Sequence, residues 1–410
     1  EGKDLLRAIS TNGKVDAALS MRADATVVAD EPTMIMAAAL PLSMRDRFER
    51  VGVIGFGSGL TTHALLGSQR VGQVDTIEIE PMVVEGARLF GDRVRRAYED
   101  PRSHIVIDDA KAFFASSPRR YDLIVSEPSN PWMGGTATLF SDEFYSFVPR
   151  HLEDDGIFLQ WLQTYEIDPA LVSSVLRAML GHFSDVQAYF TNGEDLLLIA
   201  VPKGKMPALG ARLFGDAGLR DDLARLGFRD VRDLQDTFVM DRRALVAYAN
   251  LHPSQANSDF FPILQLQAPA ARFMKAKADL NPWHGAPWPV VPFLGSFSPR
   301  AIEQPPSSVR RPLVTDRKQK AARELRRLLM EGDAGPAIEA YDPQLDYAEA
   351  LRGLGKSCRL DEAPGRNAEL IFALASDTVP FLDDRAQVGL WQSPAWLDCP
   401  PTTPLLVQAL

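Results

Sequence analysis

Cysteine is nearly absent from this chain, and long apolar runs are lacking. Only Cys358 and Cys399 occur among 410 residues, too few for a disulfide framework or a zinc site, which favours a reducing compartment. The net charge is −10, and the arginines are scattered apart from a basic run at 317–327, which we interpret as a solvated helix face rather than a site for an anionic partner. This argues against a nucleic-acid binder, because phosphate contacts need clustered Lys and Arg. No apolar run reaches the roughly 18 residues of a membrane span, and the longest, Met34 to Leu42, predicts a buried helix.

The amino-terminal end shows no signal-peptide pattern, and the sequence begins with Glu1 rather than Met. We therefore expect a processed or excised form located in the cytoplasm, with any membrane segment lying upstream of Glu1. A hydrophobic fraction of 46% and a charged fraction of 24% are those of a globular protein. At 410 residues the chain exceeds one ordinary core, so two or three structural units are expected.

From Arg50 onward the sequence alternates apolar strands with helices. Near-continuous apolar strands separated by helices predict a parallel sheet covered on both faces. The last two strands meet across Asn192-Gly193 and predict an antiparallel edge. The expected fold class is therefore α/β, a Rossmann-like sheet of the class I methyltransferase type. Strands are expected at 51–55, 73–79, 104–107, 121–125, 156–161, 186–190 and 195–201, and helices at 62–67, 82–96, 110–116, 142–152 and 169–182.

Four units are expected along the chain. Residues 1–45 hold a β-hairpin cap, turning at Asn12-Gly13, and a helix from Glu31 that ends at Pro41. Residues 46–205 form the Rossmann-like domain and 206–300 a mixed extension that completes the catalytic unit. Residues 301–410 form a helical C-terminal region, which contains a linker at 304–308 and is predicted to be helical and amphipathic from Asp316 onward.

A glycine turn carries the first functional signal. Gly55, Gly57 and Gly59 follow a buried strand and precede a helix. Glycine allows a sharp turn and lets a nucleoside pack against bare backbone. The Gly-x-Gly-x-Gly spacing suits an adenosyl sulfonium better than a pyrophosphate. A purely structural turn is the alternative.

Acidic residues end the next two strands. Glu78 comes 23 residues after Gly55, where a carboxylate accepts hydrogen bonds from ribose hydroxyls; a surface glutamate is the alternative. Asp108, Asp109 and Ala110 end the following strand, where a carboxylate could take the adenine amine. One of the two aspartates could instead cap the following helix.

The fourth strand ends in the loop Ser-Glu127-Pro-Ser-Asn130-Pro-Trp132. Ligands in open α/β sheets lie beyond the carboxyl ends of the strands, so these polar residues are expected to face the site. Two prolines stiffen the loop, which suits a group that must be positioned. A rigid turn capped by Asn130 is the alternative.

These motifs, in this order, resemble the spermidine/spermine synthase superfamily of polyamine aminopropyltransferases, and most closely its bacterial membrane-fused, spermidine-synthase-like branch. The segments at 12–17, 160–165 and 257–262 extend the resemblance over roughly residues 9–270. It implies a Rossmann-like catalytic domain behind a small β-domain, and aminopropyl transfer from decarboxylated S-adenosylmethionine to a diamine. It also implies that Glu78 binds ribose, that Asp109 binds the adenine amine, and that Glu127 takes the place of the catalytic aspartate.

Several residues depart from the family pattern. Ser58, Asn130 and Gln163 stand where the family carries acids, and Met34 and Ala39 replace a glutamine and a histidine. Three lost charges argue against tight binding of a dicationic diamine, and so against ordinary spermidine synthesis. Ser58 could instead tolerate the carboxylate of intact S-adenosylmethionine.

The sequence therefore predicts an enzyme, a transferase using S-adenosylmethionine or its decarboxylated form as co-substrate, without a metal. Three reactions stay open: aminopropyl transfer to an atypical acceptor, methyl transfer, and attack on the amino-acid chain carbon by an amine or by the donor's own amine, which releases methylthioadenosine. A non-catalytic nucleoside-binding module is the further alternative. The expected partners are a small amine or the donor itself, with a homodimer left open.

Roles are expected for the remaining site residues. Glu127 accepts a proton or anchors an amine, and Asn130 and Tyr165 assist it. Substrate contacts are expected from the following residues: Met34, Trp132, Trp161 and Gln163.

Overall fold

The computed structural model describes residues 6–11, 14–22, 27–116, 118–192, 194–278 and 280. The turn at Asn12-Gly13, the linker at 304–308 and the helical region expected at 301–410 lie outside the described residues. Within the described part of the chain, no helix is long and apolar enough to cross a bilayer.

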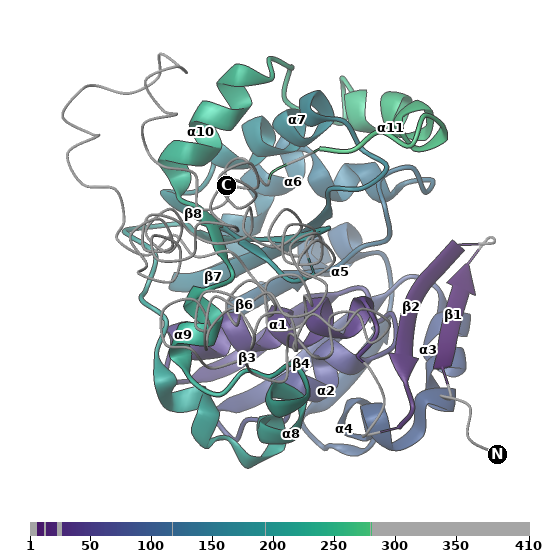
Figure 1. The fold of residues 1–410 in the computed structure, drawn as a ribbon, viewed down its shortest axis with the longest axis vertical. Coiled ribbons are helices and arrows are strands. Elements are labelled where there is room, and N and C mark those ends of the chain that lie inside the picture. Colours follow the sequence, from purple (N-terminus) through teal and green to yellow (C-terminus); the bar gives the residue numbers. More distant parts are fainter. Residues whose placement is uncertain are drawn as a thin grey trace, which may run out of the picture.

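One sheet of eight strands organises the structure (Figure 1), in the order β10-β8-β9-β7-β6-β3-β4-β5. The strands β5, β4, β3, β6 and β7 run parallel, and β9 lies antiparallel between β7 and β8. This order and the antiparallel β9 are those of the class I methyltransferase type, so the α/β fold prediction is confirmed. The strands are β3 (Phe48–Ile54), β4 (Val71–Glu78), β5 (Ser103–Ile107), β6 (Tyr121–Ser126), β7 (Leu152–Gln163), β8 (Asp185–Phe190), β9 (Asp195–Val201) and β10 (Phe238–Met240).

Helices cover both faces of the sheet, because both faces of its strands are apolar. In β9, Leu196 and Leu198 pack into one core, and Leu197 and Ile199 pack into the core on the other face. Five helices close the first core: α5 (Ala110–Ser116), α6 (Asp142–Phe147), α7 (Pro169–Leu180), α10 (Arg242–Leu251) and α11 (Ile263–Phe273). The second core is closed by α1 (Asp30–Met44), α2 (Leu60–Leu65), α4 (Arg95–Glu99) and α8 (Ala217–Arg225).

Two expected helices have different bounds. The first does not end at Pro41 but runs on to Met44. Proline removes one intrahelical hydrogen bond, but nearly all of this helix is buried, and tertiary packing outweighs that loss. The helix expected at 82–96 is broken at Gly91, whose φ is 55°. It divides into α3 (Pro81–Ala87), the 3₁₀ helix η1 (Arg88–Val94) and α4.

The amino-terminal hairpin is present as predicted. Strands β1 (Leu6–Thr11) and β2 (Lys14–Ser20) pair antiparallel, with Thr11 opposite Lys14. The start of α1 holds β2 in place, because Asp30 accepts a hydrogen bond from the Ala18 N–H and Glu31 accepts one from the Ser20 N–H, each at 2.8 Å. The hairpin is thereby fixed to the main domain.

Glu31 is fully buried and pairs with two arginines. Its Oε2 lies 2.7 Å from Arg93 and 3.2 Å from Arg225. A buried carboxylate is tolerated only when it is paired in this way. One acid thus joins β2, η1 and α8.

The described residues beyond 205, which are 206–278 and 280, pack onto the sheet. Strand β10 extends the sheet beside β8, and the apolar side chains of α8 and α10 enter the two cores. The other short elements are η2 (Thr136–Phe140), η3 (Val148–His151), η4 (Ala211–Gly215) and α9 (Val231–Gln235).

Candidate functional site

A cavity of about 660 Å³ lies at the edge of the sheet where the parallel strands end. The loops after β3, β4, β5 and β6 form its floor, and the β1–β2 hairpin contributes Lys14 to Ala17 to its wall. Ligands bind at this edge in open α/β sheets, beside the point where the strand order reverses. That reversal lies here between β3 and β6.

The three glycines of the turn differ in what a side chain at each position would contact. All three have positive φ, of 92° at Gly55, 51° at Gly57 and 83° at Gly59. A Cβ at Gly55 would lie 2.4 Å from the backbone oxygen of Glu127, and one at Gly59 would lie 2.8 Å from the Phe56 ring. Only Gly57 presents open backbone, since a Cβ there would meet nothing closer than Ala17 at 3.8 Å. Gly55 therefore joins the glycine turn to the Glu127 loop, and Gly57 is the one placed for close approach of a ligand.

Glu78 ends β4 and lines the cavity while being 8% exposed. Its two oxygens accept hydrogen bonds from the N–H groups of Phe56 and Glu80, each at 2.9 Å. Each oxygen keeps a second lone pair for a ligand. This carboxylate is not a surface residue: it fixes the glycine turn and faces the space beside it.

Asp108, Asp109 and Ala110 also line the cavity. The carboxylate of Asp109 accepts a hydrogen bond from the Ala112 N–H at 2.9 Å and so caps α5, and Asp108 accepts one from the Asp109 N–H at 2.8 Å. Of the two aspartates, Asp109 is therefore the one that caps α5, and both of them line the cavity.

Glu127 follows β6 and faces the same cavity from the opposite side of the glycine turn. Burial raises the pKa of its carboxyl to about 8; a hydrogen bond from Thr61 opposes this rise, and the charge of Asp195 adds to it. A carboxyl group with a pKa near neutrality can both hold and release a proton at working pH.

Behind Glu127 lies a buried polar layer. The Asn130 Nδ2 donates to the Tyr165 hydroxyl at 3.3 Å, and burial raises the pKa of Tyr165, which keeps its phenol protonated. Tyr165 lines the cavity, as does Trp161. Asn130 and Gln163 are fully buried and outside the lining, with Asn130 Oδ1 and both Gln163 amide atoms lacking a hydrogen-bond partner. Trp132 also lies outside the lining, packed edge-on against Tyr165 at 6.4 Å between ring centres.

The side chains of Ser58 and Met34 contact each other, and Ser58 does not line the cavity. The Ser58 hydroxyl is fully buried, donates to the Met34 sulfur at 3.0 Å and accepts from the Leu60 N–H at 3.2 Å. Met34 is the one that lines the cavity. Gly59, which completes the turn, lies outside the lining as well.

Asp195 is one of the cavity residues that sequence reasoning missed. It begins β9, opposite Gln163 of β7, and lines the cavity while being only 6% exposed. The predicted antiparallel edge contained the signal, because an antiparallel strand begins at the edge where its parallel neighbours end. Other missed lining residues are Asp16, Asp30, Thr33, Thr61 and Ser129.

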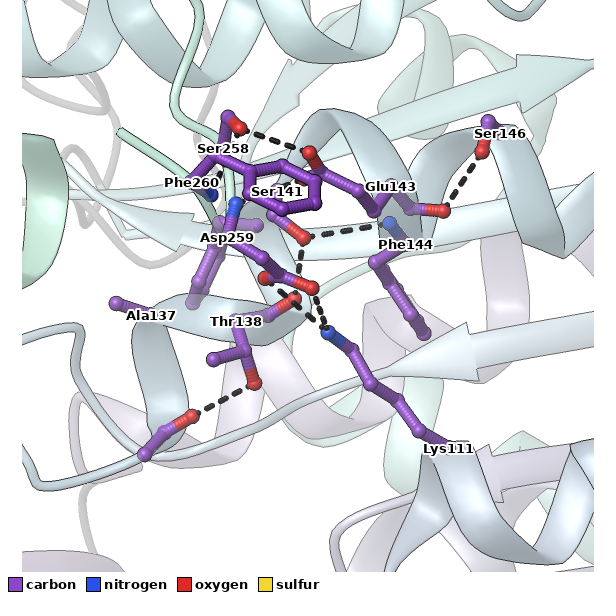
Figure 2. Close-up of polar contacts among 12 residues, drawn as sticks. Lys111, Ala137, Thr138, Ser141, Glu143, Phe144, Ser146, Ser258, Asp259 and Phe260 are labelled. Atoms are coloured by element: carbon purple, nitrogen blue, oxygen red, sulfur yellow. Dashed lines mark hydrogen bonds and ion pairs between the residues drawn. The ribbon is translucent and has the colours of Figure 1, made fainter. Parts of the chain in front are cut away.

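The segment at 257–262 lies outside the cavity lining and packs against elements that contribute to it. Asn257 donates to the carbonyls of Ala137 and Phe140, each at 3.0 Å. These two bonds hold η2, whose residues 136, 138 and 139 line the cavity. Asp259 pairs with Lys111 of α5 at 2.9 Å, and Ser258 donates to Glu143 of α6 at 2.7 Å (Figure 2).

The charges on the cavity wall are almost all negative. The described lining contains a single basic side chain, Lys14, and that lysine already pairs with Asp16 at 3.2 Å. Such a wall attracts cations and repels anions. Among the described residues, no group of three or more His, Cys, Asp or Glu side chains is arranged to hold a metal ion. The acidic members of the lining are Asp16, Asp30, Glu78, Glu80, Asp108, Asp109, Glu127 and Asp195.

The comparisons with known proteins agree with the motifs. The curated polyamine aminopropyltransferase of Bacillus subtilis (strain 168) is 28% identical over 157 residues, which are 38% of this chain and 56% of the relative. The chain thus spans about half the length of the curated relatives it matches. The solved spermidine synthase of Thermotoga maritima aligns at 22% identity with a TM-score of 0.38, covering 47% of this chain and 62% of that one. Human methyltransferase-like protein 13, solved with SAH, aligns at 22% identity with a TM-score of 0.38, covering 48% and 93%.

The match to a family rests on the sequence of the central region. Residues 33–193 match the spermine/spermidine synthase domain. They include the glycine turn, Glu78, the Asp108-Asp109 pair and the Glu127 loop, the motifs on which the resemblance was drawn. The resemblance to the spermine/spermidine synthase domain is therefore confirmed over residues 33–193 of this chain.

Proposed function

We propose that this chain is a transferase that binds an adenosyl sulfonium and transfers its alkyl chain to an amine nitrogen. The observation that carries the proposal is a single cavity with Gly57 and Glu78 on one side and Glu127 on the other. The first two offer open backbone and a carboxylate to a nucleoside, and Glu127 offers a proton acceptor. The almost wholly acidic wall suits both a sulfonium and an amine.

In the proposed binding mode, the adenosine lies over the ends of β3, β4 and β5. Glu78 accepts hydrogen bonds from the ribose hydroxyls with the lone pairs that its backbone donors leave free. The Asp108-Asp109-Ala110 corner takes the adenine, and Gly57 permits close packing of the nucleoside. The sulfonium then lies toward Glu127, at the reversal of strand order.

In the proposed step, the neutral amine nitrogen attacks the carbon beside the sulfonium. A C–N bond forms while the C–S bond breaks, and its electron pair stays on sulfur as a neutral thioether, methylthioadenosine. The new ammonium gives one proton to the Glu127 carboxylate. Because the sulfonium needs no activation, the protein acts by placing the nitrogen in line with the C–S bond and keeping it deprotonated. Tyr165 and Trp161 line the acceptor side of the cavity, and Asn130 holds the Tyr165 hydroxyl from behind the lining.

The proposed donor is the decarboxylated form of S-adenosylmethionine. An acidic wall with one paired lysine disfavours the carboxylate of the intact donor. Ser58, where the family carries an acid, contacts Met34 rather than the cavity. The acceptor is proposed to differ from that of an ordinary spermidine synthase, since Asn130 and Gln163 are neutral.

A second reaction is favoured by one observation, the position of Lys14. This lysine lies on the cavity wall and could leave Asp16 to pair with the carboxylate of intact S-adenosylmethionine. The nucleophile would then attack the amino-acid chain carbon, either from an acceptor or from the donor's own amine in a cyclisation. This reaction also releases methylthioadenosine.

Calorimetric titration tests the donor assignment. We expect decarboxylated S-adenosylmethionine and methylthioadenosine to bind, with intact S-adenosylmethionine at least tenfold weaker and NAD not binding. Tighter binding of the intact donor, lost in Lys14→Met, would favour the second reaction. Absence of binding by every adenosyl compound would refute the proposed function.

A further inference from the structure

The loop that carries Tyr165, residues 164–167, pairs with the chain that follows α11. An isolated antiparallel bridge joins Tyr165 to Lys277. The Ala278 N–H donates to the first carbonyl of the loop at 2.9 Å, and the Ile167 N–H donates back to the chain after α11 at 3.1 Å. Tyr165 lines the cavity, whereas none of the described residues after α11 does. The position of a cavity residue therefore depends on contacts made outside the cavity.

Each side of this bridge contains a residue with an unfavourable backbone conformation. Glu166 and Lys275 both have a φ of 51°, and no other non-glycine residue in the described ranges has a positive φ. A residue with a side chain stays in this left-handed region only where the surrounding structure holds it there, and such residues concentrate at functional sites. Because Glu166 directly follows Tyr165, its backbone conformation determines where the Tyr165 side chain points.

Arg272, in the last turn of α11, connects this loop to the loop after β6. Its Nε lies 3.5 Å from the Glu166 carboxylate, and its guanidinium carbon lies 5.2 Å from the centre of the Trp132 ring. Trp132 in turn packs edge-on against Tyr165. The side chains of Arg272 and Glu166 are 44% and 35% exposed, so the ion pair contributes little to global stability. Its role is therefore local, at the residues on either side of Tyr165.

The other supports of the loop do not involve Arg272. The Glu194 carbonyl accepts hydrogen bonds from the Thr164 N–H at 2.8 Å and from the Thr164 hydroxyl at 2.9 Å. The Lys277 Nζ lies 2.9 Å from the Glu194 carboxylate, and the Asn130 amide holds the Tyr165 hydroxyl. Removal of the Arg272 charge therefore changes one part of the support and leaves the start of the loop anchored.

We propose that Arg272 is a positioning residue: acting from outside the cavity through Glu166 and Trp132, it sets the direction of Tyr165 and so the fit of the acceptor amine. This inference rests on the proposed function and deepens it. Glu78 ends β4, and β6 and β3 separate β4 from β7, which precedes the Tyr165 loop. Arg272 therefore acts on the acceptor side and leaves the adenosyl side unchanged.

The kinetic test measures donor and acceptor separately in Arg272→Gln, which removes the charge and keeps a long side chain. Decarboxylated S-adenosylmethionine is the donor, and n-butylamine and 1,4-diaminobutane are the acceptor probes. We expect the acceptor KM to rise by about threefold to tenfold, the size of a lost ion pair and cation–π contact. The donor KM and the Kd of methylthioadenosine should stay within about twofold of the wild type.

Three further variants separate positioning from a general loss of structure. Arg272→Lys keeps a cation for both partners and should restore most of the acceptor KM. Glu166→Gln removes the ion pair from its other side and should raise the acceptor KM in the same direction, so it decides if Arg272→Gln fails to fold. Lys275→Gln removes an exposed cation from the same segment and is the charge-matched control, with the acceptor KM of the wild type.

Hydrogen exchange tests the positioning without turnover. In the methylthioadenosine complex, the amides of residues 164–167 should exchange at least about threefold faster in Arg272→Gln than in the wild type, while those of residues 55–59 keep their rates. Unchanged exchange at 164–167, an unchanged acceptor KM, or an equal rise in the donor KM would overturn the inference. If no amine reacts, the proposed function fails, and the exchange rates alone then decide whether Arg272 positions the loop.

Discussion

The polar groups on the two sides of the cavity differ in whether the protein itself provides their hydrogen-bond partners. On the adenosyl side, Glu78, Asp108 and Asp109 each accept backbone N–H hydrogen bonds. On the acceptor side, Asn130, Gln163 and Asp195 carry buried atoms without partners. Backbone donors stabilise a carboxylate in place at all times, whereas an unpartnered buried group carries an uncompensated desolvation cost. The adenosyl side is therefore the more preorganised of the two.

The largest expected effect is at Glu127, where the two sides meet. Glu127→Gln keeps the shape of the side chain and removes its ability to accept a proton. We expect kcat to fall by about 10²–10⁴-fold, the range of general base catalysis, while methylthioadenosine binds as in the wild type. In the wild type, kcat/KM should rise with pH up to about 8, because Glu127 must lose its proton to act as a base. Steady-state rates across pH 6–9 check both. Unchanged turnover in the variant would contradict the assignment.

The second-largest effect is expected at Gly55, where the glycine turn contacts the Glu127 loop. Gly55→Ala drives a Cβ to 2.4 Å from the Glu127 carbonyl at a φ of 92°, and we expect a loss of unfolding free energy of about 3 kcal/mol. Gly57→Ala is the matched control: its φ is also positive, but its Cβ would lie 3.8 Å from Ala17, an ordinary contact distance. The free energy of unfolding of Gly57→Ala should fall by about 1 kcal/mol, and this variant should bind methylthioadenosine more weakly than the wild type. Urea denaturation measures the first quantity. Equal losses in both variants would show that contact with the Glu127 loop is not what requires glycine.

A smaller effect is expected at Glu78, within the adenosyl side. Glu78→Gln leaves one acceptor oxygen for the two backbone N–H groups and the ligand. We expect methylthioadenosine to bind about tenfold more weakly, the size of a lost charged hydrogen bond, and the acceptor KM to change little. Calorimetry and steady-state kinetics separate these quantities. A larger effect on the acceptor than on the nucleoside would reverse the proposed division of the cavity.

The smallest effect concerns stability and its dependence on pH. The pKa of Glu127 is raised from its ordinary value of 4.5 to about 8 in the folded state, so between these values the folded protein binds more protons than the unfolded chain. Its contribution to stability therefore falls as pH rises through this window. Glu127→Gln removes that penalty. We expect its melting temperature to exceed that of the wild type by a few degrees above pH 8 and to match it near pH 5. A difference independent of pH would mean that Glu127 titrates normally.

The sequence predicted the sheet well, because near-continuous apolar strands between helices leave few alternatives. The helix expected to end at Pro41 was predicted too short, since a local rule about proline carries no information on burial. The break at Gly91 was missed because the apolar pattern of this segment predicts one continuous helix and does not reveal that a single residue has a positive φ.

Prediction of the site was uneven for a physical reason. Residues at the end of a strand or directly after it, such as Glu78 and Glu127, could be placed because strand ends meet at one edge. Ser58, which turns toward Met34, could not be placed, because its orientation depends on packing. The assignments of catalytic and binding roles remain predictions.

Product analysis tests the central claim most directly. The wild type is incubated with decarboxylated S-adenosylmethionine and a panel of candidate amines, and the adenosyl product is identified by mass spectrometry, with Glu127→Gln in parallel. We predict methylthioadenosine and an amine that has gained an aminopropyl group, both dependent on Glu127. With intact S-adenosylmethionine, formation of S-adenosylhomocysteine and a methylated product would contradict the account.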